Sequence, residues 1–585
     1  MVVALITVAV VVGLRVFDRA MSARDSLQQA MPLATVAKDQ ILAGDAEDAV
    51  ATTTQLASLT ADAREQTDDE VWKSLEWIPV VGANLHAVRT AAIVTDDLVT
   101  GALTPATSLN IKALTPVDGA VNLEAITEMQ AAVTQAAETV DKAATELETI
   151  DQNALIPQVA DALVKLTGAV DELQPMLGPA KDIIGVLPTA LGADGPRNYL
   201  MMFQNNAESR GTGGNPAALV LLTADQGRIS ITQQASSGDF NNGRATPIID
   251  LDPETVALYG DKIGRYVQDT TLSPEFSETA EIVRAFWAES FGTPVDAVVS
   301  FDPVALSYLL QATGPVTVPE YVEIEGYNVE IADQPVELNA DNAVSYLLNQ
   351  IYAEIKQPEL QDAFFATAAG TIFDAVTSGS ADPKALLEAL TKAINEGRLM
   401  YVPTDVAEAE LIGETRLSGT LPSTNEFETL LGVYVNDITE GKLDYYMQLE
   451  IVAASAQCSP EPSTFTTTAT LTNTLAPDDV DALAPYISPA RFFPKGVIST
   501  DLVLYGPVGA TAATVSVNGE PVSFSAVTHV GRPAVKINVE NPPSETRTIV
   551  VGFTASDGQY GSLSVRHTPM VRDTPVSLAT AGCSN

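Results

Sequence analysis

The sequence predicts a multidomain α+β protein in which helices come first, strands and helices then alternate, and strands alone form the C-terminal part. Three observations predict this fold class: a helical repeat of apolar residues, a change of composition near residue 191, and short Val- and Thr-rich runs after residue 434. With 585 residues, 46% of them hydrophobic, the chain can form roughly three or four domains with buried cores. We expect an anchor at residues 1–17, a helical stalk or bundle at 18–190, an α/β domain at 191–430 and a β-sandwich at 431–585.

The charge of the chain excludes some classes of partner. Asp and Glu number 75 against 31 Lys and Arg, so the formal net charge is −44. Such a field repels phosphate backbones, which excludes a general nucleic-acid binder, and it leaves no broad polybasic face for a membrane. Three histidines and two cysteines are too few for a Cys/His zinc cluster.

Residues 1–14 carry no charged side chain and consist mostly of Val, Ile, Leu and Ala. A helix needs about 20 apolar residues to cross a bilayer, so this run is short by itself. It fits the apolar region of a signal peptide without a basic leader, a buried helix, or the end of a signal anchor whose upstream residues lie outside this sequence. We favour the anchor, which predicts a single-pass cell-membrane protein with the bulk of the chain extracytoplasmic.

The two cysteines, Cys458 and Cys583, both lie in the C-terminal part of the chain. In an exported protein they fit a disulfide that ties down the terminal segment. Two lone thiols in a cytosolic protein are the alternative. We expect the disulfide, because we expect the chain to be exported.

Residues 18–184 are Ala-rich, acidic and helical in pattern. Two rows of apolar residues recur every seven positions: Ile126, Val133, Val140 and Leu147, and Met129, Ala136, Ala143 and Ile150. They form a stripe on one helix face, and the small second row favours close helix packing. The segment fits either a stalk, which can self-associate, or an ordinary helical bundle. At residues 77–85 the pattern breaks, and Pro79 and Gly82 predict a hairpin or a membrane-facing corner.

The composition changes at residues 192–196, where Gly and Pro form a linker. We predict strands at residues 199–203, 217–223, 228–232, 297–301 and 316–319, and helices at 277–291, 303–313, 339–355, 359–376 and 383–396. Strands interleaved with helices predict a sheet between helical layers, which is a three-layer α/β domain. From residue 434 onward, short strand-like runs between Gly, Pro and Asn turns predict a β-sandwich.

Residues 204–215 form the richest polar segment, at the end of the first predicted strand of the α/β domain. Open α/β sheets bind ligands at strand ends, and glycines there let backbone N–H groups approach an anion that Arg210 can pair with. The predicted ligand-binding candidates are Asn205, Asn206, Glu208, Arg210, Thr212 and Asp239. The alternative is a polar loop closed by Asn and Gly turns, with Arg210 bound to a neighbouring acid. The pattern assigns no catalytic residue and no metal ligand.

Five stretches of the chain resemble the domain family DUF4012 of actinobacterial and other envelope proteins. They are NYLMMFQNNAESRGTGGNPAALVLLTADQGRISI, LSPEFSETAEIVRAFW, VDAVVSFDPVALSYLLQATGPV, LLNQIYAEIKQPELQDAFFATAAGTIFDAV and GVYVNDITEGKLDYY. Together they span most of residues 190–450. The resemblance implies a protein of the cell envelope.

The order of elements more distantly resembles the LytR-CpsA-Psr family, whose members transfer polyprenyl-pyrophosphate-linked glycopolymers to peptidoglycan outside the membrane. Arg210 stands at the position of the arginine in that family's loop motif. Residues 295–316 and 338–346 resemble two further sequence motifs of the family. The family's aspartate after this arginine is missing, its Pro-Arg-Asp phrase is replaced at residues 233–239, and its later arginines are absent. The resemblance therefore implies a LytR-CpsA-Psr-like fold with a degenerate site, which would use Mg²⁺ only if the site were active.

Together with the apolar run at residues 1–14, the two resemblances imply a membrane-anchored envelope protein that binds or organises cell-wall glycopolymer or its polyprenyl-pyrophosphate precursor. One alternative is a divergent glycopolymer transferase, a phosphotransferase that uses Arg210 with a carboxylate such as Asp239. Another is a purely structural envelope scaffold. An apolar groove beside Arg210 that is long enough for a polyprenyl tail would favour a lipid-linked ligand over the scaffold.

Overall fold

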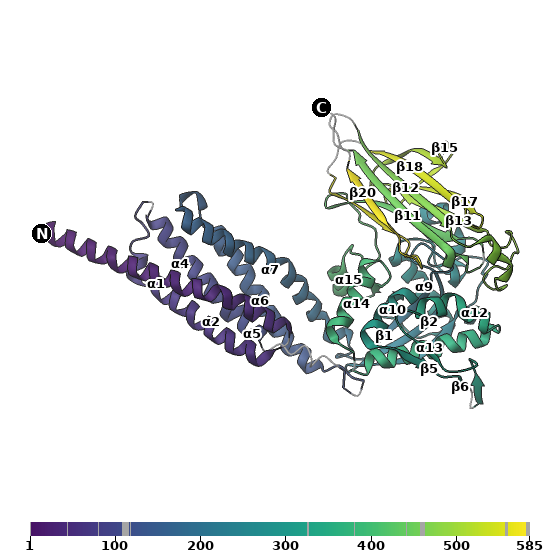
Figure 1. Cartoon of the computed structure of the whole chain (residues 1–585), viewed down its shortest axis with the longest axis horizontal. Coiled ribbons are helices and arrows are strands. Elements are labelled where there is room, and N and C mark those ends of the chain that lie inside the picture. The colour runs from purple at the N-terminus through teal and green to yellow at the C-terminus, as the bar shows by residue number, and fades with distance from the viewer. Residues whose placement is uncertain are drawn as a thin grey trace. The chain divides into compact units, whose positions relative to one another are not determined.

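The computed structural model describes residues 2–43, 45–79, 81–107, 116–117, 119–324, 327–379, 381–439, 441–456, 462–555 and 560–580. The chain divides into two compact units, Met1–Gly195 and Pro196–Asn585 (Figure 1). The first unit is helical and the second contains the sheets. A mixed α+β protein with N-terminal helices and several sheets is therefore confirmed.

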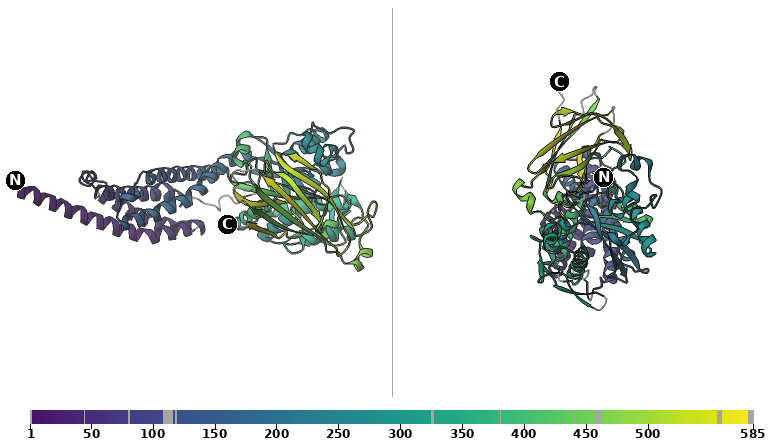
Figure 2. Two further views of the ribbon diagram at one scale, coloured as in Figure 1. Left: turned by 90° about the horizontal axis from the view of Figure 1, so that it is seen from above. Right: turned by 90° about the vertical axis from the view of Figure 1, so that its right-hand side faces the viewer.

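The first unit consists of long helices that lie side by side (Figure 1, Figure 2). They are α1 (Val2–Ala43), α2 (Ala46–Thr67), α3 (Glu70–Lys73), α4 (Val81–Leu98), α5 (Thr104–Ala106), α6 (Leu123–Glu148) and α7 (Pro157–Ala190), with a π-helical turn at Val99–Leu103 and a 3-10 turn at Gln152–Ala154. α1 packs along α2, and α6 packs along α7. Ala23, Ala30 and Ala37 of α1 are buried, and these small side chains let neighbouring helices approach closely.

The apolar stripe predicted between residues 126 and 150 is the buried face of α6 and of the turn that follows it. Its buried members are Ile126, Ala136, Val140, Ala143, Leu147 and Ile150. The helix begins where Asn122 caps it, because Asn122 Oδ1 accepts hydrogen bonds from the backbone N–H groups of Glu124 (3.0 Å) and Ala125 (3.2 Å). The helical period read from the sequence is therefore confirmed in this segment.

The predicted anchor at residues 1–17 lies at the start of α1. Within the part of the chain that the structure describes, no helix is both long enough and apolar enough to span a bilayer. Of the predicted corner at residues 77–85, residues 77–79 belong to the segment after α3 and residues 81–85 form the start of α4. Gly82 is required there, since a Cβ atom at this position would overlap the backbone carbonyl of Glu76.

The second unit begins with a five-stranded mixed sheet in the order β3-β2-β1-β4-β9. Its strands are β1 (Arg197–Asn205), β2 (Asn215–Asp225), β3 (Arg228–Ser236), β4 (Ala297–Phe301) and β9 (Met400–Pro403). β1 and β4 are parallel, and the other neighbours are antiparallel. As a result, the end of β1, the start of β2 and the end of β3 lie at one edge of the sheet.

Helices pack on both faces of this sheet. Those that contribute most are α8 (Pro253–Tyr259), α9 (Phe276–Phe291), α10 (Pro303–Thr313) and α13 (Pro358–Thr377). Leu200 and Met202 of β1 join a buried cluster with α8 and α9, whereas Met201 and Phe203 pack against a cluster that includes α10 and α13. Alternate residues of a strand face opposite sides, which explains this division.

The helix predicted at residues 339–355 begins four residues later and contains a π-helical turn. It consists of α11 (Ala343–Ser345), a π-helical turn (Tyr346–Gln350) and α12 (Ile351–Glu354). Before it, Asn339 Oδ1 accepts from the backbone N–H of Asp341 (3.0 Å), and Asn342 Oδ1 accepts from that of Asn339 (2.8 Å). These side chains hold residues 339–342 in a turn, because asparagine competes with helical hydrogen bonding. Smaller elements of this part are β5 (Val316–Val318), β6 (Tyr321–Ile324), β7 (Tyr327–Glu330), β8 (Val336–Leu338), α14 (Pro383–Asn395) and α15 (Val406–Ile412).

The C-terminal part of the second unit forms two further sheets, in the orders β16-β17-β13-β10-β19 and β15-β14-β18-β12-β11-β20 (Figure 2). Their strands are β10 (Glu428–Asp437), β11 (Met447–Ala456), β12 (Ser463–Asn473), β13 (Ile498–Tyr505), β14 (Thr511–Val517), β15 (Glu520–Pro521), β16 (Ala526–His529), β17 (Arg532–Asn541), β18 (Thr546–Ala555), β19 (Ser562–His567) and β20 (Val576–Thr580). Residues of both sheets, such as Leu502 and Phe465, belong to one buried cluster. Cys458 and Cys583, the predicted disulfide, lie outside the described residues.

Candidate functional site

The polar segment at residues 204–215 is a tight loop between β1 and β2. It closes on itself through the backbone, since the N–H of Glu208 donates to the carbonyl of Asn205 (3.0 Å) and the N–H of Asn215 donates to the carbonyl of Glu208 (3.0 Å). A Cβ atom on Gly214 would overlap the backbone of Asn205. The glycine therefore lets the chain close here, which is a structural role.

Replacing Gly214 by alanine is expected to destabilise the second unit by about 1–3 kcal/mol, because the added methyl group has no room. The measurement is the free energy of unfolding in urea. Gly370→Ala is the matched control: Gly370 lies within α13, and nothing lies within 4 Å of a Cβ atom at that position. The control should stabilise the helix by about 0.5–1 kcal/mol, and equal effects of both changes would contradict this role for Gly214.

Asn206 is completely buried and joins the loop to distant parts of the second unit. Its Nδ2 donates to Asp302 Oδ2 (2.9 Å) and to the backbone carbonyl of Pro569 (2.9 Å). Asp302 Oδ2 also receives a hydrogen bond from Arg398 Nη1 (2.8 Å), and both charged side chains are buried. Asn206 is therefore committed to the fold rather than to a ligand.

Further hydrogen bonds join the loop to the C-terminal strands. The backbone N–H of Gly211 donates to Asn436 Oδ1 (3.0 Å), and Thr568 Oγ1 donates to the carbonyl of Gly211 (3.1 Å). The N–H of Asp437 donates to the carbonyl of Ser209 (2.8 Å). An anion would need free N–H groups, and those of Ser209, Gly211, Thr212, Gly213 and Gly214 all donate to protein acceptors.

Arg210 also points into the protein. Its Nη1 donates to the backbone carbonyls of Ser209 (3.0 Å) and Asp437 (3.1 Å), and its Nε lies 3.8 Å from Asp269 Oδ1. The side chain is 11% exposed. This arrangement matches the structural alternative, in which Arg210 is bound to a neighbouring acid.

Glu208 forms a buried ion pair with Lys442, which follows β10 in the sequence. Glu208 Oε1 accepts from Lys442 Nζ, and Glu208 Oε2 accepts from Asn215 Nδ2 (2.8 Å). Burial acts to raise the pKa of Glu208, but the Lys442 ammonium, the hydrogen bond from Asn215 and the charge of Arg210 together hold that pKa below its ordinary value. Lys442 Nζ also lies 4.7 Å from the ring centre of Tyr352 and 5.0 Å from that of Tyr486.

Two buried carboxyl groups lie beneath the loop. Asp444 Oδ2 accepts from the backbone N–H of Ser209 (3.1 Å), and Asp437 Oδ1 accepts from that of Thr439 (2.8 Å). Burial raises the pKa of Asp437 to about 6, against the opposing effect of Arg210. Burial and the charge of Asp437 raise the pKa of Asp444 well above its ordinary value.

The other three candidates lie nearer to the sheet edge. Thr212 Oγ1 donates to Gln204 Oε1 (3.0 Å) and is buried. Asn205 Nδ2 donates to Tyr352 Oη (3.1 Å). Asp239 is exposed, and its Oδ2 accepts from the backbone N–H of Ser236 (2.7 Å) to cap the turn after β3. Of the six candidates, only Asn205 and Asp239 line the cavity described next.

A cavity of about 560 Å³ lies between the sheet and its helices, at the edge where β1 ends and β2 begins. Its walls come from β1, β2, β3, α10, the π-helical turn and α13. Most of the lining is apolar: Phe203, Ala217, Ala218, Leu219, Val220, Ala235, Leu306, Leu347, Leu348, Ala363, Phe365, Ala366, Ala368, Ala369 and Ile372. Its size falls within the range of about 300–1,000 Å³ that is typical of ligand sites.

Polar side chains also line this cavity, and those that carry a charge are mostly acidic. Asp239, Glu359 and Asp362 carry negative charge, against the ammonium of Lys442, which Glu208 already neutralises. Burial raises the pKa of Asp362, and the charges of Asp239 and Glu359 raise it further. A phosphate group placed among these side chains would meet repulsion instead of the several arginines that a pyrophosphate site uses.

Sequence reasoning missed Lys442, Tyr352 and Tyr486 as members of this site. Lys442 lies in GVYVNDITEGKLDYY, one of the stretches that carry the family resemblance. The available sequence signal for Lys442 was that it is a single lysine in a segment predicted to form strands. Its partner Glu208 is 234 positions away in the sequence, so no local spacing could have connected them.

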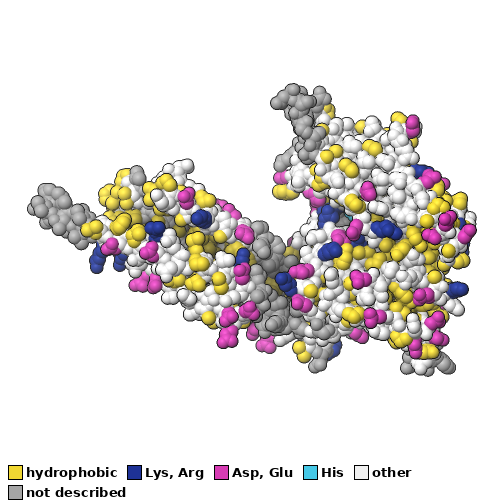
Figure 3. Space-filling view, viewed as in Figure 1, with side chains coloured by type: hydrophobic (Ala, Val, Ile, Leu, Met, Phe, Trp, Pro, Cys, Tyr) yellow, Lys and Arg dark blue, Asp and Glu magenta, His cyan; other side chains and the backbone are white. Residues whose placement is uncertain are grey.

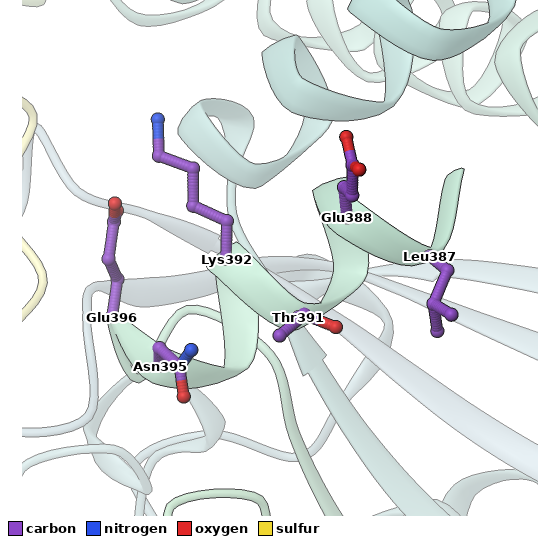
Figure 4. Close-up of a pocket in the computed structure, with 6 residues that line it drawn as sticks. All are labelled: Leu387, Glu388, Thr391, Lys392, Asn395 and Glu396. Carbon is purple, nitrogen blue, oxygen red and sulfur yellow. The ribbon is translucent and has the colours of Figure 1, made fainter. Parts of the chain in front are cut away.

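A second hollow, of about 480 Å³, lies along one helix (Figure 4). Its lining residues are Leu387, Glu388, Thr391, Lys392, Asn395 and Glu396, all from α14 and the residue that follows it. Lys392 Nζ lies 3.8 Å from the ring centre of Tyr308. A single helix face supplies no convergent polar groups, so this hollow is not a candidate site.

The residues present do not fit a magnesium site. Across the described ranges, no group of three or more His, Cys, Asp or Glu side chains is placed to hold a metal ion. On the face shown in Figure 3, acidic side chains are dispersed over each unit and form no single patch. Asp239, the carboxylate suggested as a partner of Arg210, caps its own turn instead.

The comparisons with known proteins cover part of the chain. Residues 194–352 match the model of a family described as protein of unknown function (DUF4012), which confirms the resemblance over this segment. No curated protein matches the chain.

Three solved structures are similar to part of the chain. A transcriptional regulator (EF0465) from Enterococcus faecalis is 14% identical, with 39% of this chain and 74% of that chain covered and a TM-score of 0.25. The Lin1025 protein from Listeria innocua is 16% identical, with 42% and 86% covered and a TM-score of 0.22. B. subtilis TagV is 14% identical, with 39% and 80% covered and a TM-score of 0.23.

Proposed function

We propose that the second unit binds an amphiphilic ligand of the cell envelope and holds its apolar chain in the cavity between the sheet and α13. The observation that carries this proposal is the apolar lining of a ligand-sized cavity at the carboxyl end of β1. An apolar chain inside it would be removed from water, at about 25 cal/mol for each Å² of apolar surface buried. Open α/β sheets place ligands at this kind of edge.

The finer identity of the ligand follows from the sequence. The resemblances at residues 190–450 suggest an envelope protein related to glycopolymer transferases, and the apolar run at residues 1–14 suggests attachment to a membrane. We therefore propose a membrane-anchored, extracytoplasmic protein that binds or organises cell-wall glycopolymer through its polyprenyl-linked precursor. We also propose a three-layer α/β arrangement and a β-sandwich for the second unit, and these would hold the walls of the cavity in place.

The charges around the cavity favour binding over phosphoryl transfer. Arg210 is hydrogen-bonded to Ser209 and Asp437, and Lys442 is paired with Glu208, so neither cation is available to a pyrophosphate. Asp239, Glu359 and Asp362 would repel it. The polyprenyl part would thus enter the cavity, and the charged head would remain in solvent.

The test measures binding of farnesol to the full chain by calorimetry. Ala369→Trp places a large ring in the cavity and is expected to weaken binding by about tenfold or more, which corresponds to at least 1.4 kcal/mol. Ala353→Trp is the matched control, because Ala353 is exposed on α12 and does not line the cavity. Circular dichroism melts of both variants show whether each remains folded.

Equal binding by the wild type and a folded Ala369→Trp variant would contradict the proposal, as would no binding by the wild type. A second arm replaces farnesol with farnesyl pyrophosphate, which we expect to bind more weakly. Asp239→Asn together with Asp362→Asn should strengthen binding of the pyrophosphate and leave that of the alcohol unchanged. If the wild type bound farnesyl pyrophosphate more strongly than farnesol, the proposal that the charged head group remains in solvent would be contradicted.

A further inference from the structure

The corner between α3 and α4 exposes large apolar side chains to solvent. Trp77 is 80% exposed, Val81 52% and Val71 41%. Tryptophan is rarely so exposed in a soluble fold, and it is enriched where proteins meet the membrane–water interface. The exposed side chains of Val71, Trp77 and Val81 lie within eleven positions of one another and are here called the corner surface.

The corner is fixed to the N-terminal part of α1. Val16 of α1 forms a buried cluster with Trp72 and Leu85, and Ala20 packs against it. Trp72 Nε1 donates to the backbone carbonyl of Leu85 (2.9 Å). An ion pair between Arg19 and Asp69 joins the same two segments. These contacts place the corner beside residues 16–20 of α1.

α1 also exposes large apolar side chains at this level, on the face away from Val16 and Ala20. Leu14 is 61% exposed, Phe17 63% and Met21 37%, and their spacing of three and four places them on one helix face. Asp18 is exposed on the same face, and the face ends at Arg24 and Asp25. In the other direction the sequence of α1 is apolar without a charge from Val2 to Leu14.

The charged groups around the corner are mostly paired with one another. Lys73 Nζ lies 3.1 Å from Asp68 Oδ1, and Arg89 Nε lies 2.6 Å from Glu76 Oε1. Burial acts to raise the pKa of Glu76, but Arg89 and His86 together outweigh burial and lower that pKa. Such pairing leaves little net charge to repel a lipid surface, despite the acidity of the whole chain.

We propose that the corner surface lies in the head-group region of a lipid bilayer, beside the point where α1 enters it. The argument is continuity: residues 14 to 20 span about 9 Å of helix at about 1.5 Å per residue, so a bilayer that holds the apolar run places the corner at its interface. The occupant is a lipid surface, and Trp77 is the residue that anchors the corner in it. The inference extends the proposed attachment through α1 and is independent of the cavity.

The chain supplies its own probe for this contact. Its three tryptophans are Trp72, Trp77 and Trp287. Trp72 and Trp287 are completely buried, so Trp77 dominates any change in fluorescence on binding. The full chain is mixed with phosphatidylcholine vesicles, with and without lipids brominated near the head-group end of the acyl chain. Emission wavelength, acrylamide quenching and bromine quenching are then measured, and flotation shows how much chain is bound.

On vesicles we expect a blue shift of the emission, loss of acrylamide quenching to the level of the buried tryptophans, and quenching by bromine. Trp77→Phe should abolish all three changes, whereas Trp287→Phe should retain them. A chain that floats with the vesicles while Trp77 stays open to acrylamide and unaffected by bromine would overturn the inference. So would a chain that does not float at all. Farnesol binding, measured separately, reports on the cavity and is unaffected by either result.

Discussion

Replacing Lys442 by methionine is expected to lower the free energy of unfolding of the second unit by about 3–5 kcal/mol. The side chain is 5% exposed and its ammonium neutralises Glu208, which is 15% exposed. Methionine fills a similar volume but leaves the carboxylate buried without a counter-ion. Urea unfolding at pH 7, followed by far-ultraviolet circular dichroism, measures the loss.

The matched control is Lys392→Met. Lys392 also lies over a tyrosine ring, that of Tyr308, but it is exposed on α14 and faces no buried acid. Replacing Lys392 should lower the free energy of unfolding by less than about 1 kcal/mol. The double variant Lys442→Met with Glu208→Gln should recover most of the lost stability, because the buried charge is gone. Equal costs at the two lysines, or no recovery in the double variant, would refute the ion-pair explanation.

Glu275→Gln is expected to stabilise the second unit at pH 8 by an amount on the order of 3 kcal/mol, and to have little effect near pH 4. Glu275 precedes α9 and is buried, and its Oε1 accepts from the backbone N–H of Leu421 (2.9 Å). Burial raises its pKa to about 7, with a further contribution from the charge of Glu278. Glutamine keeps the acceptor oxygen and removes the charge.

The direction of the pH dependence follows from the number of protons that the folded and the unfolded chain bind. Between about pH 4 and pH 7 the folded chain holds a proton at Glu275 that the unfolded chain has released, so stability falls as the pH rises through this window. Asp437, with a pKa raised to about 6, acts in the same direction. Unfolding curves of wild type and variant at several pH values measure the difference. Glu281→Gln, on the exposed side of α9, should leave the pH profile unchanged. A wild-type profile that rises from pH 5 to pH 8 would contradict the prediction.

Local periodicity was sufficient to predict the elements that depend on local contacts. The stripe of α6 could be read from a seven-residue repeat, because burial on one helix face imposes that repeat. The first strand and the polar loop after it could also be located, since turn-forming glycine and asparagine follow an apolar run. The turn at residues 339–342, which replaces the start of the predicted helix, could not be predicted. It depends on the side chains of Asn339 and Asn342, which bond to the backbone instead of to solvent.

The chemistry of the candidate site depended on contacts that no local pattern records. Arg210 looked available for a ligand, but a strand more than two hundred positions away supplies its hydrogen-bond acceptor at Asp437. The cavity lies beside Asn205 rather than Arg210, since β1 turns its alternate residues toward α10 and α13. Family resemblance identified the segment, and tertiary structure decided which of its side chains reach the cavity.

The hydrogen bonds between the loop at residues 204–215 and the C-terminal strands have a consequence for how the second unit unfolds. Gly211 and Thr568 are bonded although 357 positions separate them in the sequence. Cutting the chain near residue 430 would remove Pro569, one of the two partners of Asn206 Nδ2, together with the C-terminal partners of Ser209 and Gly211. The loop and these strands are therefore expected to lose amide-exchange protection in a single cooperative event. A mutation that loosens β10 or β19 would then reshape the mouth of the cavity without touching any residue that lines it.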